Sequence, residues 1–155
     1  MDLLETITRE RDKLEKDLKV AQATEPAQVC YRKVSSCTVY SRIHGCMLDL
    51  IAQVWNGPSE NHLCSNVRGD CGCIHGEQKM VGEMVHAPRA FNRHELVVMT
   101  PWSPCTHCAN LIVTLDMFSA VVYDLPTPHD TVGIDILAKV GIPMFQLNAE
   151  VVVER

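Results

Sequence analysis

The sequence has no stretch of about 18 or more consecutive apolar residues, so it predicts no helix that crosses a membrane. It also has no excess of basic residues, because 14 lysines and arginines face 19 acidic residues, for a formal net charge of −5. Proteins that grip the phosphate backbone of a long nucleic acid usually carry a basic face, so such a partner is disfavoured, although a local basic groove stays open. Internal repeats and low-complexity segments are absent as well.

What is present suits one domain: 155 residues, of which 46% are hydrophobic, can bury a substantial core. The first residues, MDLLETITRERDKLEKDLK, are too charged for a signal peptide, and we expect a soluble cytoplasmic protein. In the reducing cytosol the eight cysteines are better interpreted as free thiols or metal ligands than as disulfides.

The N-terminal segment, residues 1–22, alternates in charge and places Leu4, Ile7, Leu14 and Leu18 on one helical stripe. It predicts an amphipathic helix that packs on the body of the protein or on a partner, with a short coiled coil as the alternative. Residues 23–28 contain a proline and are interpreted as a linker. Residues 29–155 then form the main domain.

The main domain alternates between strand and helix patterns. Residues 36–58 suggest a pair of strands, and the polar, glycine-containing residues 59–73 suggest a loop. Further on we expect helices at 78–85, 105–115 and 133–140 and strands at 95–100, 119–125 and 142–148. This order predicts an α/β domain in which helices cover a central sheet.

Two cysteines lie at the start of the helix predicted at 105–115. In SPCTHC, Ser103 is a suitable N-cap and Pro104 suits the first helical position. Cys105 and Cys108 would then share one face of the first turn, where free backbone N–H groups favour thiolates. By itself a C-x-x-C pair fits a redox pair or half of a structural zinc site equally well.

A second motif, His75-Gly76-Glu77, changes this interpretation. Two thiolates and one imidazole leave zinc an open fourth position, which is typical of catalytic sites. Glu77 can exchange protons with a water at that position. Alone, Glu77 would be a solvated helix residue and His75 a helix-end residue, but H-x-E followed by P-C-x-x-C is the signature of zinc-dependent nucleobase deaminases.

From Ser36 to Asn148 the sequence resembles the cytidine deaminase superfamily, and most closely its deoxycytidylate deaminase branch. The resemblance is carried by VWNGP, IHGEQKM, MTPWSPCTHC and SAVVYDL followed by GIDILAKVGIPMF. It implies a three-layer α-β-α fold with a five-stranded mixed central sheet, commonly assembled as a homo-oligomer. The resemblance does not include the N-terminal helix.

The resemblance also implies a role for individual residues. His75, Cys105 and Cys108 would bind zinc, and Glu77 would carry protons while hydroxide attacks C4 of a cytosine ring. Asn56 would contact the sugar of the substrate, and we add Tyr123 and Trp102 as substrate contacts. His107, between the two cysteines, is expected to be exposed and not a ligand.

Three positions depart from the family pattern. Gly76 stands where alanine is usual and would loosen the helix start. Thr127 stands where a tyrosine is frequent. Trp102 is similar to a tryptophan of polynucleotide cytidine deaminases, and it either stacks on a base or fills the core beside the site.

Cysteines just before the H-x-E motif suggest a second metal. Some deoxycytidylate deaminases carry a structural zinc in this loop, and here His62, Cys64, Cys71 and Cys73 would close a tetrahedral site. The alternative is that these cysteines are small buried apolar residues. Cys30, Cys37 and Cys46 are interpreted as core or incidental thiols.

The predicted function is therefore zinc-dependent deamination of a free cytosine nucleotide, most simply dCMP to dUMP with release of ammonia. One alternative is deamination of cytosine in single-stranded DNA or RNA, which Trp102 favours and the shortage of basic residues opposes. Another is deamination of a different nucleobase or a modified pyrimidine. An alternative of a different class is a catalytically silent zinc-bound scaffold, which an intact Glu77 opposes.

Overall fold

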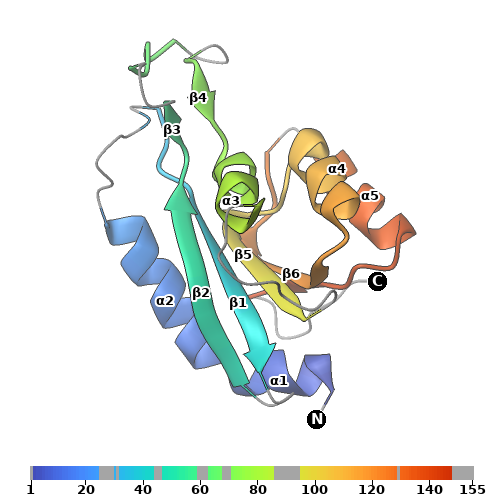
Figure 1. Cartoon of the computed structure of the whole chain (residues 1–155). Coiled ribbons are helices and arrows are strands. Elements are labelled where there is room, and N and C mark those ends of the chain that lie inside the picture. Colours follow the sequence, from blue (N-terminus) through green and yellow to red (C-terminus); the bar gives the residue numbers. More distant parts are fainter. Residues whose placement is uncertain are drawn as a thin grey trace.

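A five-stranded sheet in the order β2-β1-β5-β6-β7 forms the centre of the molecule, with helices on both faces (Figure 1). The computed structural model describes residues 2–24, 30, 32–43, 47–58, 63–67, 71–85, 95–128 and 130–147. The sheet strands are β1 Ser36–Ile43, β2 Met47–Trp55, β5 Leu96–Trp102, β6 Phe118–Leu125 and β7 Met144–Gln146. The helices are α1 Leu3–Arg9, α2 Arg11–Ala23, α3 Gly76–Val85, α4 Thr106–Leu115 and α5 Val132–Lys139.

The sheet is mixed. β1 runs antiparallel to both β2 and β5, whereas β5, β6 and β7 run parallel to one another. Two elements were not expected from the sequence: β3 Gly57–Pro58 and β4 Cys73–Ile74, which pair with each other in a separate two-stranded ribbon. The three-layer α-β-α fold and its five-stranded mixed sheet are confirmed.

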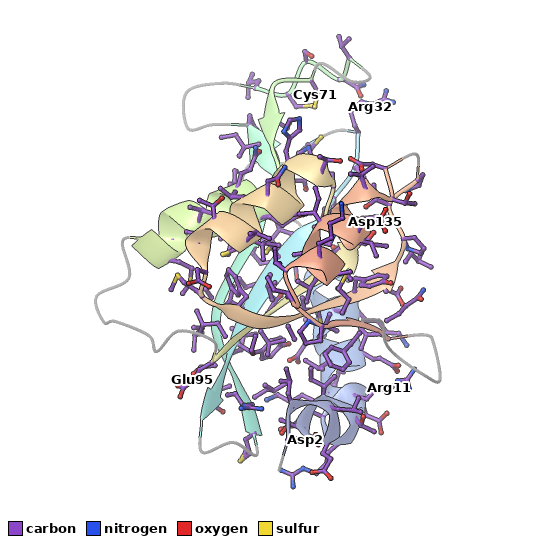
Figure 2. The ribbon with its side chains drawn as sticks, turned by 90° about the vertical axis from the view of Figure 1, so that its right-hand side faces the viewer. Asp2, Arg11, Arg32, Cys71, Glu95 and Asp135 are labelled. Atoms are coloured by element: carbon purple, nitrogen blue, oxygen red, sulfur yellow. The ribbon has the colours of Figure 1, made fainter. Side chains whose placement is uncertain are left out.

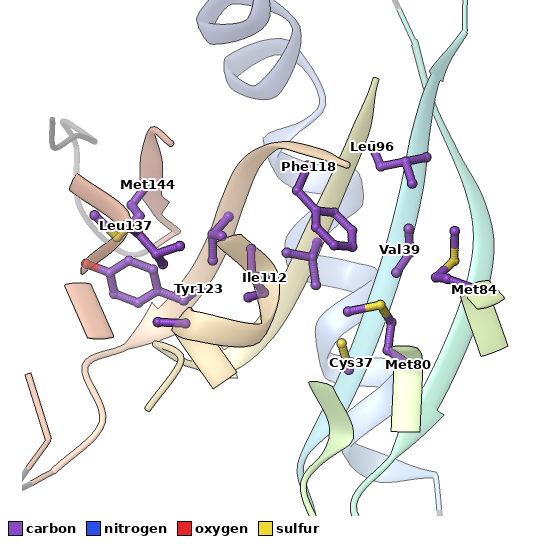
Figure 3. Close-up of a cluster of buried hydrophobic side chains, with 13 residues drawn as sticks. Cys37, Val39, Met80, Met84, Leu96, Ile112, Phe118, Tyr123, Leu137 and Met144 are labelled. Carbon is purple, nitrogen blue, oxygen red and sulfur yellow. The ribbon is translucent and has the colours of Figure 1, made fainter. Parts of the chain in front are cut away.

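Strand β5 shows why the layers form, because both of its faces are buried. Leu96 and Val98 point into one hydrophobic cluster, together with residues of α3, α4 and α5 (Figure 3). Val97 and Met99 point into the other cluster, together with residues of α1 and α2. Successive side chains of a strand face opposite sides, so this apolar run requires a helical cover on each face.

The N-terminal segment is one of these covers, but it is two helices and not one. The first helix ends at Glu10, which is the C-cap of α1 and whose N–H donates to the carbonyl of Thr6. Ile7, Leu14 and Leu18 are buried as expected, whereas Leu4 is 51% exposed.

Side chains also tie α2 to the sheet. The hydroxyl of Tyr40 in β1 donates to the Asp17 carboxylate at 2.6 Å, and the Trp55 indole donates to the carbonyl of Ala21 at 2.9 Å. Of the two possibilities for the N-terminal segment, packing on the body of the protein is the one observed. Most of the expected linker lies outside the described residues, and no described helix combines the length and apolarity needed to cross a membrane.

Leu14 provides a test of this packing. We expect Leu14→Ala to lower the free energy of unfolding by about 2–5 kcal/mol, since it empties a fully buried position. Val20→Ala on the same helix removes an apolar side chain that is 59% exposed, and should change it by less than about 0.5 kcal/mol. Urea unfolding of both variants measures the difference, and equal effects would contradict the packing described.

Candidate active site

His75 lies between β4 and α3, at a position fixed by the start of the helix. Its N–H donates to the Gln78 side-chain oxygen at 2.9 Å, and its carbonyl accepts from the Lys79 N–H at 3.0 Å. The second bond is the first of the helical pattern, so His75 occupies the N-cap position. The helix thus begins two residues earlier than its sequence pattern predicts.

The start of α4 differs from the prediction. The N-cap residue is Cys105 and not Ser103, whose hydroxyl oxygen instead accepts a hydrogen bond from the Thr127 N–H at 2.9 Å. The capping group comes from Asp130, whose carboxylate accepts from the Thr106 N–H at 2.9 Å and from its hydroxyl at 2.8 Å. These bonds lower the pKa of Asp130, because they stabilise its charged form.

Three predicted metal ligands meet between the two helix starts. The Nδ1 atom of His75 lies 3.3 Å from the Cys108 Sγ and 3.6 Å from the Cys105 Sγ, and all three ligand atoms lie within 4.8 Å of one another. Tetrahedral zinc with ordinary bond lengths separates such nitrogen and sulfur atoms by about 3.6 Å, so the donor set fits zinc. His107 is exposed on the first turn of α4, as expected.

The local electrostatics also favour a cation. A hydrogen bond from the Cys108 thiol lowers the pKa of Cys105 to about 4, while the same contact is the main cause that raises the pKa of Cys108. The hydrogen bond with Cys105 raises the pKa of His75. One thiolate is therefore formed at neutral pH, and thiolates are the form that binds metals.

Glu77 lies in the first turn of α3 and is only 7% exposed. Burial is the main cause that raises the pKa of its carboxyl group, since an apolar environment disfavours the charged form. A raised pKa makes a carboxyl group better suited to both accept and return a proton.

A pocket opens beside these residues. It is lined by Lys33, Ser35, Asn56, His75, Gly76, Glu77, Trp102, Ser103, Cys105 and Thr127. The predicted ligand Cys108 is not part of this lining, because it is fully buried. Tyr123 does not line it, because its side chain is 8% exposed and packs in the core cluster of Figure 3. Trp102, for which two roles were open, lines the pocket.

The polar lining around Lys33 and Ser35 was not predicted. No motif marks these residues, because they come from the segment before β1 and are brought to the pocket by tertiary contacts, among them those with Asn56. The Asn56 side chain donates to the Lys33 carbonyl at 2.8 Å and accepts from the Ser35 N–H at 2.7 Å, and its own N–H donates to the Ser35 carbonyl at 2.9 Å. Asn56 thus holds this wall in place, while its predicted contact with a sugar stays a prediction.

Gly76 has a different role from the one expected. A Cβ atom here would lie 3.2 Å from the Cys37 Cβ and 3.2 Å from the Ser35 carbonyl oxygen. The glycine therefore allows the segment before β1 to approach the start of α3 closely. We expected the glycine to loosen the helix start, whereas the structure shows that it permits close packing there.

Four cysteines form a second cluster at one end of the molecule, where β4 lies. Cys30, Cys64, Cys71 and Cys73 have sulfur atoms within 4.8 Å of one another. Figure 2 shows Cys71 at this end, near Arg32 of the segment that follows Cys30. The Sγ of Cys30 lies 3.8 Å from that of Cys71 and 3.9 Å from that of Cys64. A disulfide needs about 2.05 Å, whereas tetrahedral zinc places two sulfurs about 3.8 Å apart.

This cluster changes the predicted ligand set. Cys64, Cys71 and Cys73 come together as expected, but the fourth member is Cys30, which was interpreted as a core or incidental thiol. His62 and Cys46 lie outside the described residues. Cys37 lies in the core, as predicted. No sequence pattern marks Cys30 as a ligand, because it lies far from the other three cysteines along the chain.

Gly133, at the start of α5, is in close contact with the loop that carries Cys105. A Cβ atom at this position would lie 2.1 Å from the Pro104 carbonyl oxygen and 3.0 Å from the backbone of Cys105. That separation is far below van der Waals contact, so only glycine allows the helix to approach the ligand loop this closely.

Comparisons with known proteins agree with this architecture. Comparison with protein-family models found no match to the sequence, and comparison with curated proteins found none either. Solved structures do match. The apo dCMP deaminase from cyanophage S-TIM5 is 19% identical, with 88% of this chain and 95% of that chain covered and a TM-score of 0.65. The same enzyme in complex with dCMP and dUMP is 21% identical, with 94% and 98% covered and a TM-score of 0.64.

A third structure, the Rib2 deaminase from Aspergillus oryzae in complex with DARIPP, is 15% identical, with 87% of this chain and 81% of that chain covered and a TM-score of 0.52. At these identities the likeness concerns the fold. The chain shares its three-layer α/β fold with these deaminases, which agrees with the fold that the sequence resemblance implied.

The close approach of Gly133 can be tested by Gly133→Ala. We expect overpacking to destabilise the protein by about 1–3 kcal/mol and to lower its zinc content, because the Cys105 loop must move. The control is Gly82→Ala in α3, where a Cβ meets nothing within 4 Å and helix propensity predicts a gain of up to about 1 kcal/mol. Thermal unfolding and metal analysis of both variants provide the measurement; retained zinc and unchanged stability in Gly133→Ala would contradict the contact.

Proposed function

We propose that this protein is a zinc-dependent deaminase that converts a free cytosine nucleotide, most simply dCMP, to the uracil nucleotide and ammonia. The observation that carries the proposal is the meeting of His75, Cys105 and Cys108 beside the buried carboxyl group of Glu77 at one pocket. Each feature alone has a structural explanation, but together they supply a metal site and a proton carrier to the same cavity.

In this proposal His75, Cys105 and Cys108 hold the metal through one nitrogen and two sulfurs. Three protein ligands leave a position for substrate or water, as catalytic zinc sites do. When bound there, zinc would lower the pKa of a water molecule and make it nucleophilic at neutral pH. The proposal gives His107 no part in binding, because it is exposed on α4 and does not belong to the ligand cluster.

Glu77 moves the proton. Its carboxylate takes a proton from the attacking water while the water oxygen forms a bond to C4 of the ring. It delivers that proton to ring nitrogen N3, then takes the second proton of the former water and passes it to the exocyclic nitrogen; C4=O forms as the bond from C4 to this nitrogen breaks, and ammonia leaves. The raised pKa of Glu77 suits a group that must both accept and donate.

The pocket lining favours a small nucleotide over a strand. Lys33 is the one lysine or arginine among the described residues that line the pocket, whereas strand binding usually needs a run of basic residues along a groove. Trp102 offers one aromatic surface, enough for one base or sugar. The solved complex of the cyanophage enzyme with dCMP and dUMP supports a nucleotide of this size.

Two other substrate classes remain as alternatives. The likeness to a deaminase bound to DARIPP favours a different aminopyrimidine, and Trp102 favours cytosine in a single strand. Ammonia release from dCMP, CMP, deoxycytidine, 5-modified dCMP, guanine, DARIPP and a cytosine-containing strand separates these classes. Silence on all of them would favour the zinc-bound scaffold. The homo-oligomer and the cytoplasmic location stay predictions.

We also propose that Cys30, Cys64, Cys71 and Cys73 bind a second, structural zinc. Four sulfur ligands leave no open position, which is the mark of a structural site. The cluster joins three chain segments: the one that leads to Lys33 and Ser35, the loop before β4, and β4 itself, which leads to His75. Metal binding here would stabilise two walls of the pocket without taking part in the reaction.

Glu77→Gln tests the assigned chemistry. We expect kcat for dCMP to fall by about 10²–10⁴-fold while zinc content stays unchanged, since Glu77 is not a ligand in the proposal. The matched control is Glu83→Gln at an exposed position of the same helix, which should keep full activity. Full activity in zinc-loaded Glu77→Gln would refute the mechanism.

Metal stoichiometry tests the two sites separately. We expect two zinc ions per chain, and one in each of the variants Cys105→Ser and Cys71→Ser. Cys105→Ser should lose activity with little change in thermal stability, whereas Cys71→Ser should lower the melting temperature, because a closed zinc site contributes folding energy directly. One zinc per chain in the wild type, with no loss in Cys71→Ser, would remove the structural site from the proposal.

A further inference from the structure

Lys33 has an unusual position for a lysine on the wall of a pocket. Its ammonium nitrogen lies 3.6 Å from the centroid of the Trp102 ring, within the range of cation–π contacts. Both residues line the candidate active site. The charge of Lys33 therefore covers a face of the aromatic ring that a substrate would use.

The backbone of Lys33 is held by a hydrogen bond, whereas its side chain is long and exposed. The Lys33 carbonyl accepts a hydrogen bond from the Asn56 amide at 2.8 Å, and Ser35 is bonded to the same side chain. The Lys33 side chain itself is exposed, and a lysine stem has four rotatable carbons. Because the backbone is fixed and the side chain is long, the ammonium group can reach two different partners.

The charges of the pocket make Lys33 the natural partner of an anion. Lys33 is the one lysine or arginine of the described lining, which also holds the acidic groups of Glu77 and Cys105, and Glu77 is buried beside the metal ligands. A phosphate group brought in by a substrate would be repelled by Glu77 and attracted by Lys33. A charge-assisted hydrogen bond from ammonium to phosphate is stronger than a partly exposed cation–π contact, so phosphate can draw Lys33 away from Trp102.

We propose that Lys33 is the specificity-determining residue that selects a 5′-phosphorylated substrate, and that phosphate binding moves its ammonium group off Trp102 and frees the indole face. This inference rests on the proposed nucleotide deaminase function. It assigns to one residue, unmarked by any motif, the distinction between a nucleotide and the corresponding nucleoside. The role is one of binding, because Lys33 exchanges no proton in the reaction.

Binding of the products separates this role from turnover. Calorimetric titration of the zinc-loaded protein with dUMP and with deoxyuridine measures the two dissociation constants without any reaction. We expect Lys33→Met, which keeps the length of the side chain but removes its charge, to weaken dUMP binding about tenfold or more and deoxyuridine binding less than twofold. Lys33→Arg should retain most of the dUMP affinity, because it keeps the positive charge.

The matched control is Lys16→Met, which removes the same charge from an exposed position of α2, in the opposite helical layer. It should leave both dissociation constants unchanged. A second readout is tryptophan fluorescence with inorganic phosphate alone. Phosphate should change the emission of the wild type and of Lys16→Met but not that of Lys33→Met, since it is the ammonium group of Lys33 that lies over the Trp102 ring.

The outcomes separate the proposed role of Lys33 from the proposed deaminase function. If dUMP binds Lys33→Met as tightly as the wild type, the role of Lys33 is refuted and the nucleotide deaminase proposal stands. Equal affinity of the wild type for dUMP and deoxyuridine refutes selection by phosphate. If the wild type deaminates no cytosine compound but binds dUMP in a Lys33-dependent way, the phosphate site is supported and the deaminase proposal fails.

Discussion

The close approach of two helix starts is the constraint on which the candidate site depends. His75 comes directly before α3, and Cys105 comes directly before α4. The two helix starts must therefore lie side by side for the three ligand atoms to fall within 4.8 Å of one another. Strand β5 fixes one of them, because it is buried on both faces between the two core clusters and delivers its carboxyl end to Cys105. Residues at the carboxyl ends of such strands are favoured places for ligand binding in α/β folds.

Loops hold this geometry through backbone contacts more than through apolar packing. Asp130 caps α4 from the start of α5, Gly133 allows α5 to lie against the Cys105 loop, and Asn56 fixes the segment before β1. Buried backbone groups need hydrogen-bond partners, and these three residues supply the partners or the space where regular structure ends. Contacts made by residues other than the ligands thus hold the site in place.

The chain contains two sets of metal-binding side chains with different chemistry. The set of His75, Cys105 and Cys108 opens on a pocket and has a buried carboxyl group beside it. Among the described residues no buried carboxyl group accompanies the set of four thiols, and four sulfur ligands would leave zinc no open position. Cys73 and His75 lie two positions apart along the chain, so the four-thiol cluster is next to the candidate active site and, in the proposal, stabilises its wall without sharing its chemistry.

The sequence by itself determined what is local or periodic. The layered α/β fold follows from the alternation of strand and helix patterns, and the four central site residues follow from two short motifs, each at the start of a helix. Only the tertiary structure decided which distant residues join them. Cys30 completes the four-thiol cluster, Asp130 replaces Ser103 as the cap, Tyr123 packs in the core, and Lys33 reaches Trp102. These contacts join segments far apart along the chain, where no fixed spacing exists, and so they depend on how the packed layers bring the loops together.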